Sequence, residues 1–355
     1  MDYIYLGTSG LRVPKYILGT LPFSGTNGFE AMGDVDVKEA TKMVDMSLDA
    51  GINMFDTANL YSHGDAEKVL GSAIKDRRDE VLLTSKTGFQ LGDNPNARGA
   101  SRLNIEKSIE ASLKRLGTDY LDLYFVHLWD GRTPVEETIA VMTDLVKSGK
   151  IRYWGVSNYS GWALARTYTL AEQAGYIPPV CQQIYYTPEA REAEYELLPA
   201  AGELGMGSMI WSPLGEGLLN GKISRGQTAP ENTRQGAGWP EPWVMDNERL
   251  YNVIDALQEV ADARGATVPQ IALAWVKDRP NVGPVVIAAR NEDQLRENIN
   301  SFEMVLTEDE HDKIESVTRP EPFYPLWHRV MSSFDRGSPS EMPYLKGYKK
   351  SMNIE

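Results

Sequence analysis

Four polar side chains stand where buried strands should end. Asp56 closes the segment Asn-Met-Phe-Asp, Lys86 closes Val-Leu-Leu-Thr-Ser-Lys, His127 closes Leu-Asp-Leu-Tyr-Phe-Val-His, and Tyr61 lies in the loop just after Asp56. Such apolar runs are typical of buried parallel strands. A buried strand has no reason to finish on an ionisable group unless its end opens into a site. An acid, a phenol, an ammonium and an imidazole that meet there suggest a tyrosine made acidic by a cation.

The segments that must position these residues alternate between strand-like and helix-like. Strands are expected at 15–20, 53–58, 81–86, 122–127, 152–158, 180–186, 207–213 and 284–288. Amphipathic helices are expected after them at 37–51, 66–75, 104–117, 134–149, 161–175, 195–205, 268–277 and 292–300. Eight such units close a barrel whose strands all end on one face, where chemistry sits. The sequence therefore predicts an α/β fold, a (β/α)8 TIM barrel.

Four segments fall outside this repeat. Residues 3–13 read as an N-terminal β-hairpin, and the Gly- and Pro-rich stretch 214–246 reads as a long loop after the seventh strand, of the length seen in lids and binding loops. An additional helix is expected at 250–265. No linker divides the chain, which predicts one domain over 1–355, with a core at about 5–318 and a C-terminal helix or tail at 319–355.

Composition excludes several classes of protein. The net charge of −14 argues against general binding to nucleic acid or anionic membranes, although a local basic pocket still suits a small anion. Cys181 is the single cysteine, so no intrachain disulfide can form. The first residues lack a basic start and a long apolar run, and no stretch approaches the length of a membrane span. We expect a cytoplasmic protein, monomeric or homo-oligomeric.

Several motifs resemble the aldo-keto reductase family, from about Tyr5 to Thr318. They are Gly-Ile-Asn-Met-Phe-Asp-Thr-Ala, Leu-Asp-Leu-Tyr-Phe-Val-His, Gly-Val-Ser-Asn, Ile-Pro-Pro-Val-Cys-Gln-Gln, Trp-Ser-Pro-Leu-Gly and Gln-Leu-Arg-Glu-Asn. The sequence most resembles the branch of potassium-channel β subunits and their bacterial relatives. The resemblance implies a barrel that reduces carbonyls with a nicotinamide cofactor and lacks the Rossmann fold, in agreement with the absence of a Gly-rich strand-turn-helix fingerprint.

The resemblance also assigns roles to the four polar residues. Tyr61 becomes the general acid, Lys86 the cation beside it, Asp56 the partner of the lysine, and His127 a donor that orients the substrate carbonyl. A nearby ammonium favours the phenolate and lowers the pKa of a tyrosine. Channel β subunits have an asparagine in place of the histidine, so His127 favours a working reductase.

The same resemblance implies a cofactor site. Ser157, Asn158 and Gln183 match the positions that hydrogen-bond the nicotinamide carboxamide, and Trp211 takes the place of a tyrosine that stacks on the ring. The remaining cofactor positions are Gly19, Thr20, Asp56, Ser212, Leu214, Lys222, Arg234, Arg290, Gln294, Glu297 and Asn298.

Three cations in that set decide the expected cofactor. Lys222, Arg234 and Arg290 are candidate phosphate ligands, and Arg290 precedes a helix whose N-terminus itself favours an anion. Arginine is well shaped for bidentate phosphate binding. We therefore expect NADP(H), while NAD(H) stays open as an alternative.

The substrate is the least readable part. Leu21, Phe23, Phe89 and Trp129 follow strand ends and are candidates to line an apolar pocket, and the aromatics of the tail form either another wall or a packing surface. A bulky cyclic ketone and a small aldehyde both remain open. The alternative to an enzyme is a redox-sensing regulatory subunit that binds NADP(H) with little turnover. A metal hydrolase is disfavoured because its usual histidine pairs are missing, so no metal is expected.

Overall fold

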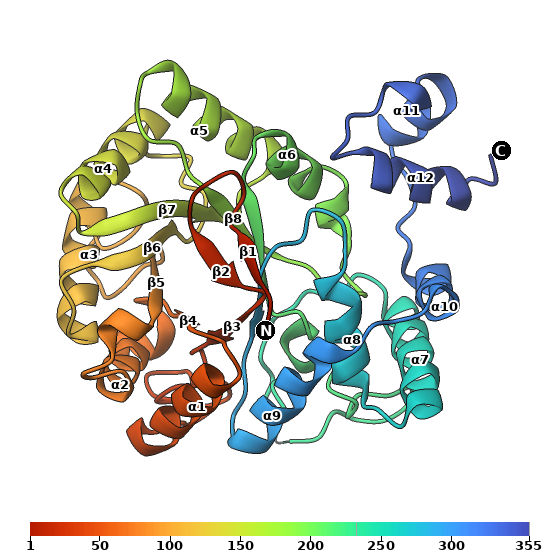
Figure 1. Ribbon diagram of the computed structural model, residues 1–355, viewed down its shortest axis with the longest axis horizontal. Helices are drawn as coiled ribbons and strands as arrows, with labels where there is room; N and C mark the ends of the chain where they lie inside the picture. The colour runs from red at the N-terminus through yellow and green to blue at the C-terminus, as the bar shows by residue number, and fades with distance from the viewer. Residues whose placement is uncertain (232, 355) are drawn as a thin grey trace.

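Parallel strands close into a barrel in the computed structural model, which describes residues 1–231 and 233–354 (Figure 1). Within these residues the strands neighbour one another in the order β10, β3, β4, β5, β6, β7, β8, β9, and β10 returns to pair with β9. Their bounds are β3 (Tyr16–Gly19), β4 (Met54–Asp56), β5 (Leu82–Thr87), β6 (Leu121–Val126), β7 (Ile151–Ser157), β8 (Cys181–Tyr185), β9 (Gly207–Trp211) and β10 (Val285–Ile287). The predicted (β/α)8 barrel is confirmed.

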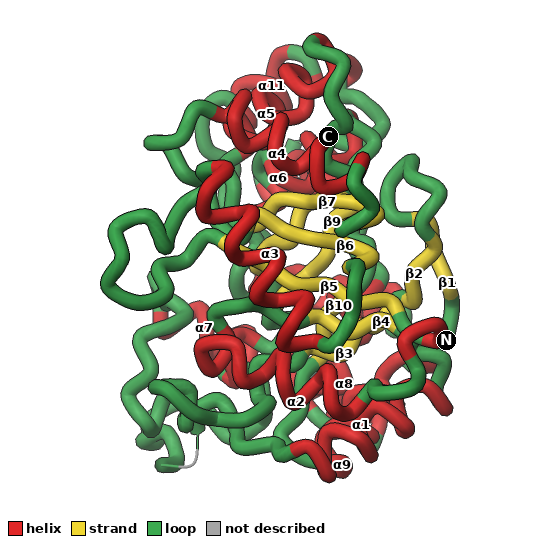
Figure 2. Tube along the Cα trace, turned by 90° about the vertical axis from the view of Figure 1, so that its left-hand side faces the viewer, coloured by secondary structure: helices red, strands yellow, loops and turns green. Residues whose placement is uncertain are grey.

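Helices surround the barrel on its outside (Figures 1 and 2). Those that follow successive strands are α1 (Val37–Asp49), α2 (Asp65–Ala73), α3 (Arg102–Leu116), α4 (Val135–Lys147), α5 (Gly161–Gln173), α6 (Leu197–Glu203), α8 (Val268–Lys277) and α9 (Glu292–Asn300). The additional helix is α7 (Asn247–Arg264), which begins three residues before its predicted start because Asp246 caps it through the backbone N–H groups of Glu248 and Arg249.

Two apolar clusters hold these layers together. The larger lies between strands and helices, and it draws on side chains such as Tyr124 and Trp154 from the sheet and Ile109 and Trp275 from the helices. The smaller joins inward-facing residues of the strands, among them Phe125, to residues of the hairpin. Because successive residues of a strand face opposite sides, one strand serves both clusters.

The predicted hairpin is formed by β1 (Tyr3–Tyr5) and β2 (Arg12–Pro14), which pair antiparallel and cross the barrel in Figure 1. Leu6 and Val13 of this hairpin are fully buried in the inner cluster. Thr8 donates its backbone N–H to the carbonyl of Gly205, just before β9. The hairpin therefore covers the end of the barrel where the strands begin and leaves the other rim open.

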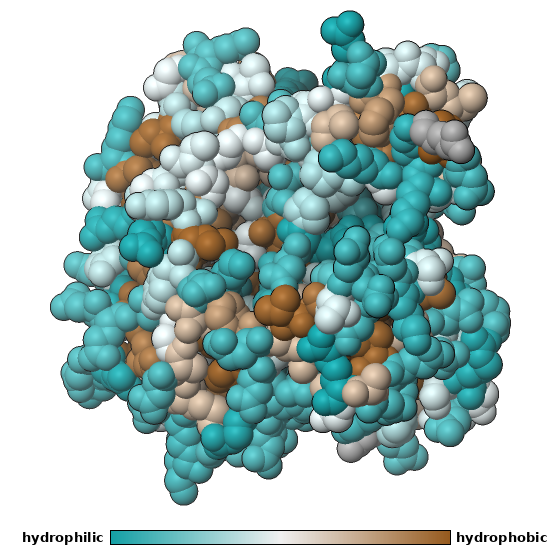
Figure 3. All heavy atoms as spheres, turned by 45° about the vertical axis from the view of Figure 1, so that its right-hand side comes forward, coloured by the Kyte–Doolittle hydropathy of each residue, from teal (hydrophilic) through white to brown (hydrophobic). Residues whose placement is uncertain are grey.

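The C-terminal segment forms helices rather than an irregular tail. After α10 (Glu308–Thr318) come α11 (Leu326–Ser332) and α12 (Met342–Ser351), which lie to one side of the barrel in Figure 1. Asn281 holds the start of α12 through a hydrogen bond of 2.8 Å to the Ser340 carbonyl. The face seen in Figure 3 is largely hydrophilic, with small apolar patches. Among the described residues, no helix is both long and apolar enough to cross a bilayer.

Gly155 tests the packing inside the barrel. A Cβ at this position of β7 would lie 2.8 Å from the Cys181 carbonyl oxygen and 2.6 Å from the Phe125 ring. We expect Gly155→Ala to lower the free energy of unfolding by about 1–3 kcal/mol or more, the usual cost of overpacking. Urea denaturation measures this. Gly10→Ala is the control, because its Cβ would meet nothing closer than 3.9 Å. Equal stability of the two variants would contradict the packing described.

Candidate active site

The four polar residues of the strand ends come together at the open rim of the barrel. Asp56 is the last residue of β4, Lys86 is the penultimate residue of β5, and His127 follows β6 directly. Tyr61 opens the short helix η1 (Tyr61–Gly64) that follows β4. The Lys86 ammonium lies 2.5 Å from a carboxylate oxygen of Asp56 and 3.3 Å from the Tyr61 hydroxyl. The Tyr61 and His127 rings lie 6.2 Å apart, edge to face.

The ion pair between Asp56 and Lys86 is buried and fully satisfied. Lys86 is 0% exposed and Asp56 is 2% exposed. The second carboxylate oxygen of Asp56 accepts hydrogen bonds from Thr84 at 2.5 Å and from Gln183 at 3.1 Å. Lys86 donates a further hydrogen bond of 2.8 Å to the Thr57 carbonyl. A buried ion pair is stable only with such additional partners, because both charges have lost their water.

The pKa of Tyr61 differs from the expectation. Burial raises the pKa of the phenol, and the Lys86 ammonium opposes burial by lowering it. The sequence suggested a net lowering, but the loss of water around the phenol outweighs the nearby charge. Burial by itself would also lower the pKa of Lys86, yet the Asp56 carboxylate and the phenol overcome it and raise that pKa. At neutral pH, Tyr61 is therefore a protonated phenol beside a permanent ammonium.

His127 is a neutral imidazole, and one of its ring nitrogens makes no hydrogen bond to the described residues. Burial, reinforced by Lys86, holds its pKa well below the ordinary value. Its Nδ1 is buried and has no hydrogen-bond partner among the described residues. The ring is held edge to face against Phe89 at 4.8 Å, and its backbone carbonyl accepts a hydrogen bond of 2.9 Å from Asn158. A neutral, fixed imidazole can donate to a carbonyl oxygen without carrying charge into the site.

These residues open into a cavity of about 550 Å³, which is within the usual range for cofactor and substrate sites. The predicted residues that line it are Gly19, Leu21, Asp56, Tyr61, Phe89, His127, Asn158, Gln183, Trp211, Ser212, Leu214, Lys222, Arg234, Arg290, Gln294, Glu297 and Asn298. The structure thus gathers residues from β3 to α9 around one space.

Five predicted residues do not line this cavity. Lys86 is buried behind Tyr61 and reaches the cavity through it. Thr20 supports the site by donating its side-chain hydroxyl to the Asp56 carbonyl at 3.1 Å, and Ser157 does so by donating to the Gln183 carbonyl at 2.8 Å. Phe23 is 0% exposed within the outer core cluster. Trp129 packs against other aromatic rings outside the lining.

Amide groups and an indole lie side by side in the lining of the cavity. Asn158 adopts a left-handed backbone conformation (φ 57°), which lets its N–H reach the Gln183 carbonyl at 3.3 Å. Its side-chain oxygen accepts a hydrogen bond of 3.2 Å from the Trp211 indole, whose ring also contacts Tyr185 at 4.8 Å. Trp211 is therefore fixed in orientation, as a surface on which a flat ring can stack.

Cations also line the cavity. Burial and the nearby charge of Arg234 hold the pKa of Arg290 below its ordinary value, so two guanidinium groups face a common space. Arginine remains charged in proteins all the same. Arg290 donates to the carbonyls of Ala31 and Met32, which links the loop after β3 to the start of α9. Lys222 is exposed and also lines the cavity.

Glu216 is a site residue that the sequence did not indicate. It lies in η4 (Gly215–Gly217) with a left-handed backbone (φ 55°) and is 5% exposed. One carboxylate oxygen accepts a hydrogen bond of 2.6 Å from Ser212, and the other forms an ion pair with Arg234. Gln235 donates to its backbone carbonyl at 3.1 Å. Glu216 thus joins the long loop to the end of β9. Periodicity within one segment of the sequence cannot predict such a contact between segments.

Two further aromatic residues of the cavity were also missed. Phe29 and Trp239 both line it, and their rings lie 6.3 Å apart. They come from the loop after β3 and from the long loop after β9. The tail aromatics instead pack elsewhere: Phe323 lies against Tyr195 at 4.2 Å and does not line the cavity. Tyr324 and Trp327 lie against each other at 6.1 Å, and neither is among the described residues that line the cavity, so the tail forms no wall of it.

The donors of the cavity fit a nicotinamide dinucleotide phosphate. Amide groups and a flat indole suit a carboxamide-bearing ring, and paired guanidinium groups suit phosphate. Gly19 leaves no room for a side chain, because a Cβ would lie 2.7 Å from the side chain of Val286. No group of three or more His, Cys, Asp or Glu side chains that could hold a metal ion occurs in the described part of the chain.

The fold and the site together define a (β/α)8-barrel protein. Its open rim carries a polar site made of an aspartate, a lysine, a tyrosine and a histidine. The model of the Aldo/keto reductase family matches residues 16–319, and the chain belongs to this family. Membership supports an NADP-dependent oxidoreductase in general terms.

Two curated relatives agree with the branch indicated by the sequence. One, from Oryza sativa subsp. japonica, is 35% identical over 334 residues, which cover 91% of this chain and 98% of that protein. The other, from Arabidopsis thaliana, is 35% identical over 341 residues, which cover 93% of this chain and 100% of that protein. Both are named probable voltage-gated potassium channel subunit beta.

The low pKa of His127 predicts how its imidazole titrates. In the unfolded chain this imidazole takes up a proton near pH 6.5, whereas the folded chain resists it. Unfolding then binds protons, so the free energy of unfolding falls as the pH drops below that value, by up to about 1.4 kcal/mol per pH unit from this group. His127→Asn should remove this part of the pH dependence of the free energy of unfolding. The NMR signal that is lost in the variant identifies the His127 imidazole. A His127 midpoint near pH 6.5 in the folded protein would contradict the buried neutral imidazole.

Proposed function

We propose that the protein is an NADP(H)-dependent oxidoreductase that reduces an aldehyde or ketone to an alcohol, or runs the reverse reaction, with Tyr61 as general acid and base. The observation that supports this most is the Lys86 ammonium, 3.3 Å from the Tyr61 hydroxyl and 2.5 Å from Asp56 at the edge of the cavity. A fully buried lysine between a carboxylate and a phenol gives little to the fold that an apolar residue would not give. Its position instead suits proton transfer from Tyr61.

Reduction of a carbonyl places a hydride on carbon and a proton on oxygen. When bound, the reduced nicotinamide would supply the hydride. Tyr61 would donate its proton to the carbonyl oxygen, and the phenolate left behind would be stabilised by the Lys86 ammonium. Asp56 would keep Lys86 in place through the exchange. His127 would donate a hydrogen bond to the same oxygen, where negative charge develops and fixed donors contribute most.

The proposed cofactor orientation follows from these two sets of lining residues. Asn158 and Gln183 would hold the carboxamide of the nicotinamide, with Ser157 supporting Gln183, and Trp211 would lie against the ring. Ser212 and Leu214 would contact the pyrophosphate. Arg290, with Arg234 or Lys222, would bind the phosphate of the adenosine end, and an anion between two guanidinium groups relieves their mutual repulsion.

The proposed substrate is a carbonyl compound with an apolar body. The apolar part of the cavity lining includes Leu21, Phe29, Phe89 and Trp239. Aromatic walls of this kind suit a cyclic or aromatic ketone, and a small aldehyde would fit in the same space. The side chains therefore support a class of substrate and not a single compound.

The second candidate is a regulatory subunit that binds NADP(H) with little turnover. The names of the two relatives favour it, since both are called probable potassium channel β subunits. The buried imidazole of His127 beside Tyr61 favours the enzyme. Incubation with a panel of aldehydes and ketones while the NADPH absorbance is followed separates the two. Tight cofactor binding with constant absorbance across the panel would favour the subunit.

Tyr61→Phe tests the proton donor. The change removes the transferable proton and keeps the ring, so turnover should fall at least about a hundredfold, the usual scale of general acid catalysis. The dissociation constant of NADPH, measured by fluorescence titration, should stay nearly unchanged.

The matched control is Tyr185→Phe. The Tyr185 hydroxyl is also buried and makes no hydrogen bond to any of the four polar residues of the site, and its ring contacts Trp211. We expect this variant to keep its turnover. Near-normal turnover of Tyr61→Phe would remove Tyr61 from the mechanism.

Arg290→Met tests the selection of NADP over NAD. A charge-assisted contact to phosphate contributes about 1.5–3 kcal/mol, which corresponds to about a ten- to hundredfold change in affinity. NADPH binding should weaken by that factor while NADH binding barely changes, as measured by titration of both cofactors. Arg225→Met is the control, because Arg225 lies on the long loop after β9, pairs with Glu248 and is not among the described residues that line the cavity. Equal weakening for both cofactors would instead place Arg290 at the shared pyrophosphate or in support of the fold.

A further inference from the structure

A second cavity, of about 280 Å³, lies on the flank of the barrel under the C-terminal helix α12. Its walls come from α12, from α10, from the connection after α8, and from the loop after β8 that carries Arg191. Among the described residues it shares no lining residue with the active-site cavity. What it could hold is therefore independent of the proposed function.

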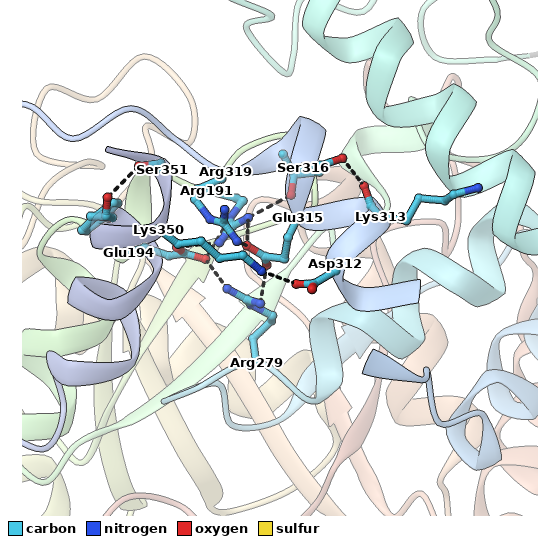
Figure 4. Close-up of polar contacts among 12 residues, drawn as sticks. Arg191, Glu194, Arg279, Asp312, Lys313, Glu315, Ser316, Arg319, Lys350 and Ser351 are labelled. Carbon is cyan, nitrogen blue, oxygen red and sulfur yellow. Dashed lines mark hydrogen bonds and ion pairs between the residues drawn. The ribbon is translucent and has the colours of Figure 1, made fainter. Parts of the chain in front are cut away.

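The floor of this cavity is a network of buried ion pairs (Figure 4). Arg191 bonds both Glu194 and Glu315, with distances of 2.9 and 3.0 Å. Arg279 reaches the same two carboxylates. Arg319 adds a longer contact of 3.4 Å to Glu315. The two carboxylates are thus already surrounded by donors, whereas Arg319 is only weakly engaged.

Positive charge is in excess around this space. Among the described residues, the lining carries five basic side chains and three acidic ones, in a chain with a net charge of −14. One of the three acids, Asp312, is paired with Lys350 at 2.8 Å across the edge of the cavity. Lys346 is exposed at the rim on α12. A local excess of cations in a strongly acidic protein calls for an anionic partner.

Two hydrogen-bond donors point to the same conclusion. The Nε of Arg319 and the hydroxyl of Tyr348 are buried and have no partner among the described residues, and both residues line the cavity. Tyr348 is 2% exposed, and its ring stacks on Tyr195. Burial raises the pKa of Tyr348, so its hydroxyl remains a donor. Buried donors normally have a hydrogen-bond acceptor. Two donors without one in the same cavity therefore indicate an acceptor that binds there.

A glycine lies next to one of these donors, the Nε of Arg319. Gly347 lies inside α12, where glycine destabilises a helix relative to alanine. A Cβ at this position would meet Arg319 Nε at 3.9 Å, an ordinary contact, so alanine would fit without strain. The helix therefore gives up stability at the residue that faces the unpartnered guanidinium nitrogen.

We propose that this cavity binds a small oxyanion with two or more negative charges, a phosphate group or a compact dicarboxylate. Arg319 Nε and the Tyr348 hydroxyl would donate to its oxygens, and Lys346 would close over it from the rim. The anion would join α12 to the end of α10, so that its concentration controls how firmly the C-terminal helices are held against the barrel.

Isothermal titration calorimetry with inorganic phosphate, at an ionic strength held constant with chloride, tests the proposal. We expect saturable binding to the full chain, and an increase in the melting temperature with phosphate. Malonate, titrated in parallel, distinguishes a phosphate site from a dicarboxylate site, and tighter binding of either supports an oxyanion site.

Matched variants show where the anion binds. Tyr348→Phe removes a hydroxyl that has no partner among the described residues, so the fold should keep its stability while phosphate affinity falls about tenfold or more. Lys346→Gln should weaken binding and Lys349→Gln should not, because both lysines are on α12 but only Lys346 lines the cavity. Gly347→Ala should raise the melting temperature without phosphate and reduce the further rise on adding it.

Three outcomes would overturn the proposal. The first is the absence of saturable binding of either anion. The second is equal weakening by Lys346→Gln and Lys349→Gln, which would mean diffuse attraction to surface charge. The third is unchanged affinity in Tyr348→Phe together with loss of binding in Arg290→Met, which would place the phosphate in the active-site cavity. That last result would leave the proposed function intact.

Discussion

The ion pair between Asp56 and Lys86 is the interaction on which the site depends. It joins the ends of β4 and β5, and its two residues are 0% (Lys86) and 2% (Asp56) exposed. An unpaired charge at this depth would be very costly. Thr84 and Gln183 donate hydrogen bonds to the Asp56 carboxylate, and the Thr57 carbonyl accepts a hydrogen bond from the Lys86 ammonium. The position of Tyr61 follows from this arrangement, because its hydroxyl accepts a hydrogen bond from the same ammonium. The barrel thus brings the ends of β4 and β5, a residue of β8 and the start of η1 to one charge pair.

Both cavities concentrate basic side chains in a chain that is acidic overall. A chain with a net charge of −14 repels anions at long range, yet it gathers Arg234 and Arg290 in the lining of the active-site cavity. It also gathers Arg319 and other cations under α12. In both places carboxylates lie among the guanidinium groups: Glu216 at the first and Glu315 at the second. These acids hold the cations in position in a chain whose overall field would otherwise keep an anion away.

Much of this arrangement could be predicted because the information is local. Each buried strand is a short apolar run, and a strand that ends on Asp56 or precedes His127 shows the open rim directly, since parallel strands all end on the same face. Helices with a regular apolar stripe were placed within a few residues. Alternation of this kind is carried by neighbouring residues and needs no knowledge of the rest of the chain.

What could not be predicted depends on long loops and on burial. Glu216 meets Arg234 and Phe29 meets Trp239 only after the barrel has closed, and no period links such residues in the sequence. Phe23 follows a strand as a pocket residue would, but it turns into the core and is 0% exposed. The direction of the pKa shift of Tyr61 depended on how much water the folded site excludes. A charge beside the phenol is visible in the sequence, and its burial is not.

The most direct test of the central claim compares Asp56→Asn, Lys86→Met and the double variant in both stability and turnover. Breaking a buried pair costs about 3–5 kcal/mol, whereas replacing both partners is often nearly neutral. If the pair exists for chemistry, each single variant should be strongly destabilised. The double variant should recover most of the lost free energy of unfolding and still bind NADPH, yet its carbonyl reduction should remain at least about a hundredfold below that of the wild type. A stable double variant with normal turnover would show that Lys86 serves only the fold, and would contradict this account.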